Sequence, residues 1–255
     1  DHSKYPHEAI TPHESDALPD NRMLDEVLEA ATAENFEINA WAVFMHNSAI
    51  GIRYPEATVT NCFGNRFISE LCPSGPMVAG YITGLATDLS SRGITHLGIE
   101  SLHFHGAHHG EHHERFFLEM GSVTAFLLSL CFCRWCISHF SGDGHALKNK
   151  VATLLQPFLD ESDPWLSLQL TKATLGEICG DELLDYLASR EAIVAQRYQE
   201  VSAAANRYNV RTKFIDQAPL IEGSGSTPRR MSWQVGIDNS LIDQHVDIFE
   251  PLIYR

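Results

Sequence analysis

Basic residues are scarce in this chain of 255 residues. It holds 18 lysines and arginines against 33 aspartates and glutamates, for a formal net charge of −15. Because nucleic-acid binding depends on clusters of basic side chains, and none is present, we expect no nucleic-acid partner. The sequence also lacks the apolar run of roughly 18 residues that a membrane-spanning helix needs, so we expect no membrane partner.

Motifs for nucleotide binding and serine hydrolysis are missing as well. No strand-like segment leads into Gly-x-Gly-x-x-Gly, and the phosphate-binding pattern Gly-x-x-x-x-Gly-Lys does not occur. No serine lies in Gly-x-Ser-x-Gly. Nucleotide-dependent chemistry and a serine-histidine-aspartate hydrolase therefore have no support in the sequence.

Cysteine is too rare for a disulfide scaffold, with six residues in the whole chain. The cysteine count does not settle the compartment of the protein. We expect a soluble protein and favour a cytoplasmic location. Asp1 does not resemble a natural start, and the chain stops at Arg255 inside a strand-like segment. We therefore expect residues 1–255 to form one catalytic domain of a longer chain. The oligomeric state is left open.

Apolar periodicity predicts alternating helices and strands. Spacing at i, i+3, i+4 and i+7 predicts helices near residues 20–35, 76–93, 123–130, 147–158 and 183–201. Short apolar runs predict strands near residues 36–45, 94–100, 210–216, 232–238 and 246–254. Residues 46–72 are expected to form a long loop. The alternation indicates an α/β fold of the (β/α)8 TIM-barrel type. The barrel is expected to be incomplete, because about five strands are predicted. An open doubly wound sheet is the alternative.

Polar residues follow four of the predicted strands: His46, Glu100, Asp216 and Asp238. Ligands bind beyond the carboxyl ends of strands in both barrels and open α/β sheets, so these side chains are expected to converge. Glycoside hydrolysis needs two carboxylates, one as acid and the other as base or nucleophile. We predict Glu100 as the general acid/base and Asp216 or Asp238 as its partner.

Histidines are concentrated after the strand that ends at Glu100. Half of the 14 histidines fall between residues 96 and 113. Imidazoles can hydrogen-bond sugar hydroxyl groups or bind a transition metal. The residues expected to bind a carbohydrate substrate are His46, Asn47, His103, His105, His109 and Trp233. A metal-dependent hydrolase or lyase that uses His103, His105, His109 and His113 remains an alternative, as does a carbohydrate-binding barrel without catalysis.

Three cysteines lie close together at Cys131, Cys133 and Cys136. They are numerous enough for a structural zinc site, with Cys72 as a fourth ligand. A second Cys-x-x-Cys pair is missing, and free cysteine packs well as a small apolar residue. Buried reduced thiols are therefore the favoured interpretation and no cofactor is expected, with zinc at these cysteines or at the histidine-rich loop as the alternative.

Three segments carry a resemblance to a protein family. They are the helix start at residues 71–76, the strand at residues 98–104 and the Cys-x-Cys-x-x-Cys run at residues 131–136. Over residues 40–140 the chain resembles poorly characterised bacterial glycoside-hydrolase-like (β/α)8 proteins. The resemblance implies a barrel fold and a carbohydrate substrate. Of the site residues, it carries over only Glu100, as an acid on the matching strand.

Overall fold

A four-stranded parallel sheet lies at the centre of the fold. The computed structural model describes the chain except for residues 7–9, 13–21, 107–118, 217–231 and 253–255. In spatial order the strands are β1 (Asn39–Val43), β4 (His96–Glu100), β5 (Arg211–Asp216) and β6 (Ile248–Pro251). All three strand pairs are parallel, so their carboxyl ends meet at one edge of the sheet. The predictions of these four strands are confirmed.

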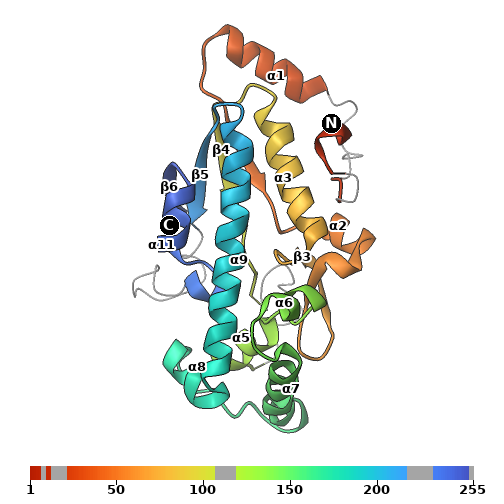
Figure 1. The fold of residues 1–255 in the computed structure, drawn as a ribbon, viewed down its shortest axis with the longest axis vertical. Coiled ribbons are helices and arrows are strands. Elements are labelled where there is room, and N and C mark those ends of the chain that lie inside the picture. The colour runs from red at the N-terminus through yellow and green to blue at the C-terminus, as the bar shows by residue number, and fades with distance from the viewer. Residues whose placement is uncertain (7–9, 13–21, 107–118, 217–231, 253–255) are drawn as a thin grey trace.

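Helices connect the strands of the sheet (Figure 1). The α-helices in predicted segments are α1 (Arg22–Ala33), α3 (Pro76–Ser90), α5 (Ser122–Ser129), α7 (Gly144–Asp160) and α9 (Asp181–Asn206). The further α-helices are α2 (Ser48–Arg53), α6 (Arg134–His139), α8 (Lys172–Cys179) and α11 (Asn239–Ile242). Short 3-10 helices are η1 (His2–Lys4), η2 (Pro55–Ala57), η4 (Ser232–Val235) and η5 (Asp243–His245). Among the described residues, none of the helices combines the length and apolar character needed to cross a membrane.

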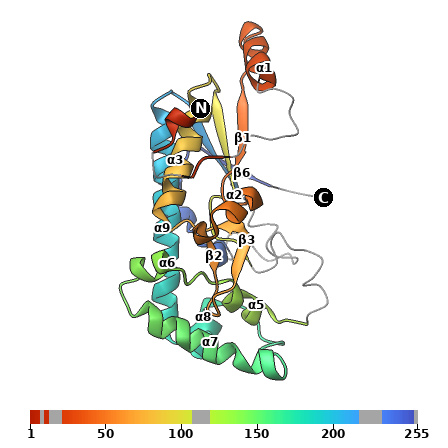
Figure 2. The same ribbon diagram turned by 90° about the vertical axis from the view of Figure 1, so that its right-hand side faces the viewer.

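The two faces of the parallel sheet differ in composition. Figure 2 shows α3 and α9 on the same side of the strands, and the Tyr198 ring of α9 packs edge-to-face on Phe214 of β5. The row of Ala42, Ile99 and Phe214 is buried on this side. Since side chains alternate along a strand, Trp41 and Glu100 lie on the other face. We call the face turned away from α3 and α9 the far face.

Residues 46–72, predicted as a loop, instead contain regular structure. After α2 and η2, strands β2 (Thr58–Thr60) and β3 (Arg66–Leu71) pair antiparallel in a small second sheet. A Cβ atom on Gly51 of α2 would lie 1.8 Å from the carbonyl oxygen of Ile68, so α2 packs directly on the β3 backbone. Tertiary packing of this kind stabilises elements too short to show a period in sequence.

The predicted strand at residues 232–238 is wrong. Residues 232–235 form η4, and Gly236 follows with a φ of 78° that breaks any extended path. Trp233 and Val235 are both buried. The apolar alternation at residues 232–238 thus reflects burial in a tight turn rather than a strand. The described residues contain four parallel strands in one sheet and not a closed eight-stranded barrel.

Candidate functional site

Glu100 lies at the carboxyl end of β4, on the far face of the sheet. Its carboxylate accepts a hydrogen bond from the indole N–H of Trp41 on β1. Glu100 is half-buried, whereas Trp41 is 52% exposed. The indole holds a carboxylate at a partly open position, which suits a group that exchanges a proton with a ligand.

The backbone turns sharply immediately after Glu100. Ser101 is buried and has a φ of 56°, a left-handed conformation that is uncommon for serine. Hydrogen bonds from the N–H groups of Phe44 and Met45 to the carbonyls of Glu100 and Ser101 continue the β1–β4 pairing through this turn. Backbone strain of this kind concentrates at functional sites, where the surrounding structure enforces it.

Three of the predicted histidines gather beyond the same edge. The ring centroids of His103 and His105 are 4.8 Å apart, and those of His46 and His105 are 6.1 Å apart. His103 and His105 are buried, and Nδ1 of His103 lies 2.7 Å from the carbonyl oxygen of Phe104. His46 also forms a β-bridge with Glu70, a fully buried carboxylate. His46, which follows β1, therefore lies close to His103 and His105, which follow β4.

The two predicted partner carboxylates occupy different settings. Asp216 ends β5 next to β4 and is buried; alternation places it on the same face as Phe214, toward Tyr198 of α9. Asp238 caps α11 and accepts hydrogen bonds from the Ser240 backbone N–H and hydroxyl at 2.8 and 2.6 Å. The hydrogen bonds from Ser240 lower the pKa of Asp238. Asp216 therefore lies on the opposite face of the sheet from Glu100, and Asp238 lies outside the strands.

The other predicted site residues have identifiable local contacts. Asn47 caps α2, where its side chain accepts from the Ile50 N–H at 3.0 Å. Trp233 is buried and packs edge-to-face on Phe126 with ring centroids 5.2 Å apart. His109 and His113 lie outside the described residues. Binding of a sugar by these residues stays a prediction.

Two carboxylates escaped the sequence reasoning. Glu70 sits inside β3, a strand that the sequence did not predict. Glu250 on β6 is in register with Ile215 on β5. Ile215 follows Phe214, which pairs with Ile99 on the side of α9, so Ile215 and Glu250 lie on the far face, as Glu100 does. Its carboxylate lies 3.6 Å from Nζ of Lys213. A signal for Glu250 was present, since it stands within a predicted strand, but its position inside the strand rather than at its end concealed it.

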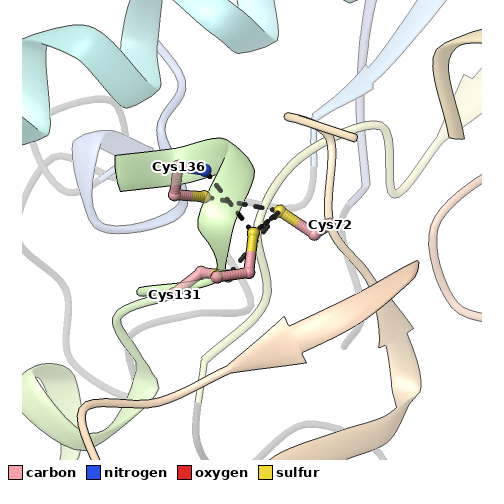
Figure 3. A group of neighbouring side chains, drawn as sticks. Cys72, Cys131 and Cys136 are labelled. Atoms are coloured by element: carbon pink, nitrogen blue, oxygen red, sulfur yellow. Dashed lines mark hydrogen bonds between the residues drawn. The ribbon is translucent and has the colours of Figure 1, made fainter. Parts of the chain in front are cut away.

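A second site is formed by four cysteines, of which Figure 3 labels Cys72, Cys131 and Cys136. Cys72 follows β3, Cys131 and Cys133 precede α6, and Cys136 lies within α6. Cys72, Cys131 and Cys136 are buried, Cys133 is half-buried, and all four are free thiols. Sequence reasoning placed Cys72 here only as an option, because 59 residues separate it from Cys131.

The sulfur atoms have the spacing of a tetrahedral metal site. All four lie within 4.8 Å of one another, and among the described residues this is the one such group of possible metal ligands. From the Cys72 sulfur, the sulfurs of Cys136, Cys131 and Cys133 are 3.4, 3.6 and 3.7 Å away. A tetrahedron with zinc–sulfur bonds of about 2.3 Å has edges of about 3.8 Å. The three distances from the Cys72 sulfur are close to this edge length.

Hydrogen bonds and burial act in opposite directions on the thiols of the cluster. The Thr60 backbone N–H lies 3.4 Å from the Cys131 sulfur, and the Cys136 N–H lies 3.5 Å from the Cys133 sulfur. Hydrogen bonds from the other three cysteines lower the pKa of Cys133, whereas burial raises the pKa of Cys72 and of Cys136. Such donors lower the cost of negative charge on sulfur and orient the ligands.

Comparison with known proteins yields likeness in fold alone. No protein-family model matches the chain, and no curated protein sequence matches it. The β-galactosidase from Bacillus circulans sp. alkalophilus superposes on 95% of the chain with a TM-score of 0.52 and 15% identity. The β-galactosidase from the psychrophilic Marinomonas ef1 superposes on 99% with a TM-score of 0.51 and 8% identity. The chain spans about a third of each enzyme, 34% and 37%. Its fold is thus similar to part of a glycoside hydrolase.

Proposed function

We propose that the protein is a glycoside hydrolase-like enzyme with Glu100 as its general acid/base. The observation that carries the proposal is the setting of Glu100: a carboxylate at the carboxyl end of a central parallel strand, held by Trp41 and followed by the left-handed Ser101. The similarity in fold to two β-galactosidases supports a carbohydrate substrate. His46, His103 and His105 would hydrogen-bond its hydroxyl groups.

The second carboxylate has three candidates. Asp216 and Asp238 are the residues predicted from the sequence, and Glu250 joins them because it shares the far face and strand register with Glu100. One strand separates β4 from β6, and neighbouring strands lie about 4.8 Å apart. The Cα atoms of Glu100 and Glu250 are therefore roughly 10 Å apart, a span that two glutamate side chains can close to the separations found in glycosidases.

A turnover screen tests this proposal. Wild type and Glu100→Gln are assayed side by side on nitrophenyl and natural glycosides, with the bound metal recorded. Loss of a general acid/base is expected to lower kcat/KM by roughly 10² to 10⁴. Glu56→Gln, in η2 outside the site, is the matched control and keeps wild-type turnover. Asp216→Asn, Asp238→Asn and Glu250→Gln then identify the partner by the size of their loss.

Three outcomes would contradict the proposal. Equal turnover by wild type and Glu100→Gln would remove Glu100 as the acid/base. Sugar binding without any turnover, unchanged in Glu100→Gln, would instead support the carbohydrate-binding alternative. Turnover that disappears with a chelator in an otherwise folded protein would support the metal-dependent alternative at the histidines.

We also propose that Cys72, Cys131, Cys133 and Cys136 hold a structural zinc ion. Four protein ligands complete the tetrahedral coordination of zinc, which leaves no open position for a substrate or water. The ion would thus contribute stability rather than chemistry, joining the segment after β3 to α6. The match between the sulfur spacing and a zinc tetrahedron carries this proposal.

A further inference from the structure

The turn between β3 and α3 carries both a cysteine of the cluster and a buried hydroxyl group. Residues 72–75 form this turn, which is closed by a hydrogen bond of 3.3 Å from the Gly75 N–H to the Cys72 carbonyl. Pro73 stands at the second position, where its fixed φ suits a tight turn. Ser74 follows it, so the place of its hydroxyl relative to Cys72 is set by the turn itself.

The Ser74 hydroxyl lies against a sulfur atom of the cluster. Its Oγ is 3.1 Å from Sγ of Cys136, and Sγ of Cys72 lies 3.4 Å from the same sulfur (Figure 3). Ser74 and Cys136 are both 2% exposed, so the contact is shielded from water. When Cys136 is a thiol, either group can donate this hydrogen bond. A thiolate has no proton, so opposite a thiolate the hydroxyl must donate.

The other outside donors to the cluster are backbone groups. The Thr60 N–H reaches the Cys131 sulfur, and the Cys136 N–H reaches the Cys133 sulfur. Of the described residues, Ser74 alone brings a side-chain hydroxyl or N–H to the four sulfurs. This donor can therefore be removed by substitution, while the backbone donors stay in place.

We propose that Ser74 is a positioning residue of the four-cysteine metal centre, where its hydroxyl donates to the Cys136 thiolate and raises the affinity for the ion. Cysteine binds zinc as the thiolate. A hydrogen bond to a charged acceptor is stronger than one between neutral groups, so the hydroxyl stabilises the metal-bound cluster more than the metal-free thiols. The role of Ser74 rests on the proposed zinc centre and adds to it a residue that does not touch the metal.

A second buried serine provides a matched control. Ser90 lies at the end of α3 and is 2% exposed, as Ser74 is. Its Oγ makes no hydrogen bond to the described residues and so none to the cysteine sulfurs. Ser90→Ala therefore removes a buried hydroxyl without removing a donor to the cluster. Ser74→Thr, in contrast, keeps the hydroxyl at the cluster.

The first measurement is zinc affinity by competition with a chromophoric chelator, in reduced protein under anaerobic conditions. Ser74→Ala is expected to bind zinc roughly 10-fold more weakly than wild type, at the lower end of the losses that outer-shell changes produce. Ser90→Ala is expected to keep the wild-type affinity, and Ser74→Thr to stay closer to it than Ser74→Ala does.

The second measurement is the absorption spectrum of the protein loaded with Co²⁺ in place of zinc. The thiolate-to-cobalt charge-transfer band of Ser74→Ala is expected at longer wavelength than that of wild type. The reason is that the hydrogen bond lowers the energy of the sulfur lone pair, and its loss makes electron transfer to the metal easier. A loss of packing alone would leave the sulfur without this change and the band in place.

Each result decides between distinct conclusions. Wild-type zinc affinity in Ser74→Ala overturns the role of Ser74 and leaves the zinc centre standing. Weaker affinity with an unshifted cobalt band makes Ser74 a packing residue, which also overturns the proposal. Wild-type protein that binds neither zinc nor cobalt overturns the centre and the role of Ser74 together. If Ser74→Ala does not fold, Ser74→Gly, which also lacks the hydroxyl and suits a turn, replaces it under the same criteria.

Discussion

The contact between Trp41 and Glu100 links an exposed aromatic ring to the proposed catalytic carboxylate. Trp41 is the one described tryptophan that is more than half exposed, and its indole N–H donates to Glu100. Trp41→Phe retains the aromatic ring and removes the donor. The loss of one hydrogen bond to a charged group is expected to lower kcat/KM about tenfold, equivalent to about 1.4 kcal/mol.

Kinetics on the glycoside that wild type cleaves best would check this prediction. Trp165→Phe, a tryptophan outside the far face, is the control for the loss of an indole. Wild-type kcat/KM in Trp41→Phe would show that the indole does not position Glu100. A larger KM with unchanged kcat would instead indicate that the ring binds the substrate equally in the ground and transition states.

The places of individual candidate residues were predictable where the residues follow a strand. Glu100 and His46 lie at strand ends as predicted, because polar residues directly after apolar runs stand out in a sequence. Their role in a site stays a prediction. Glu70 was missed because β3 packs on α2 and pairs with β2, contacts that no local pattern records. Cys72 was only an option because the chain must fold before it meets Cys131. The sequence cannot report such distant neighbours.

At the scale of single elements, the end of α9 depends on one left-handed residue. Asn209 is exposed and has a φ of 58°, just before β5 begins. Asparagine tolerates this conformation better than other side chains apart from glycine. Asn209→Ala is therefore expected to lower the free energy of unfolding by about 1 kcal/mol, and Asn209→Gly to leave it nearly unchanged. Urea denaturation of the three proteins checks this, and equal stability of the alanine variant would contradict it.

The packing of α2 on β3 leaves no room for a side chain at Gly51. A Cβ atom on Gly51 would collide with the Ile68 carbonyl, whose oxygen belongs to the backbone and cannot rotate away. Gly51→Ala is expected to destabilise the protein by roughly 2 to 3 kcal/mol, the usual cost of overpacking. Gly64→Ala serves as a comparison for backbone strain alone, because its added Cβ meets nothing within 4 Å although φ is 88°. Thermal unfolding of both variants measures the difference, and an equal loss in both would argue against close packing.

Elements with a clear apolar pattern were predictable, and elements without one were not. Helices α3, α7 and α9 show their apolar stripes over several turns, and β1, β4 and β5 are compact apolar runs. By contrast α2, α6 and α8 span eight residues or fewer and depend on tertiary contacts. The error at residues 232–238 has the same origin, since Trp233 and Val235 are buried by packing of a turn rather than by sheet formation.

On the scale of the whole molecule, the four cysteines come from segments that the parallel sheet does not join. Cys72 continues from the small β2–β3 sheet, while Cys133 and Cys136 belong to the start of α6, which packs on α7. The proposed zinc ion would tie these segments together and would stabilise the native state by mass action. Removal of zinc by a chelator is therefore expected to lower the melting temperature of wild type. A variant that lacks one ligand should show no such response.

The most direct test of this account is the zinc content of reduced, reconstituted protein. We predict about one zinc ion per chain in wild type, substantial loss in Cys72→Ser, and retention in Cys179→Ser, a matched control whose thiol is buried outside the cluster. Elemental analysis alongside protein quantitation gives the ratio. Wild-type protein without zinc, or Cys72→Ser with the full wild-type content and affinity, would contradict the four-cysteine centre.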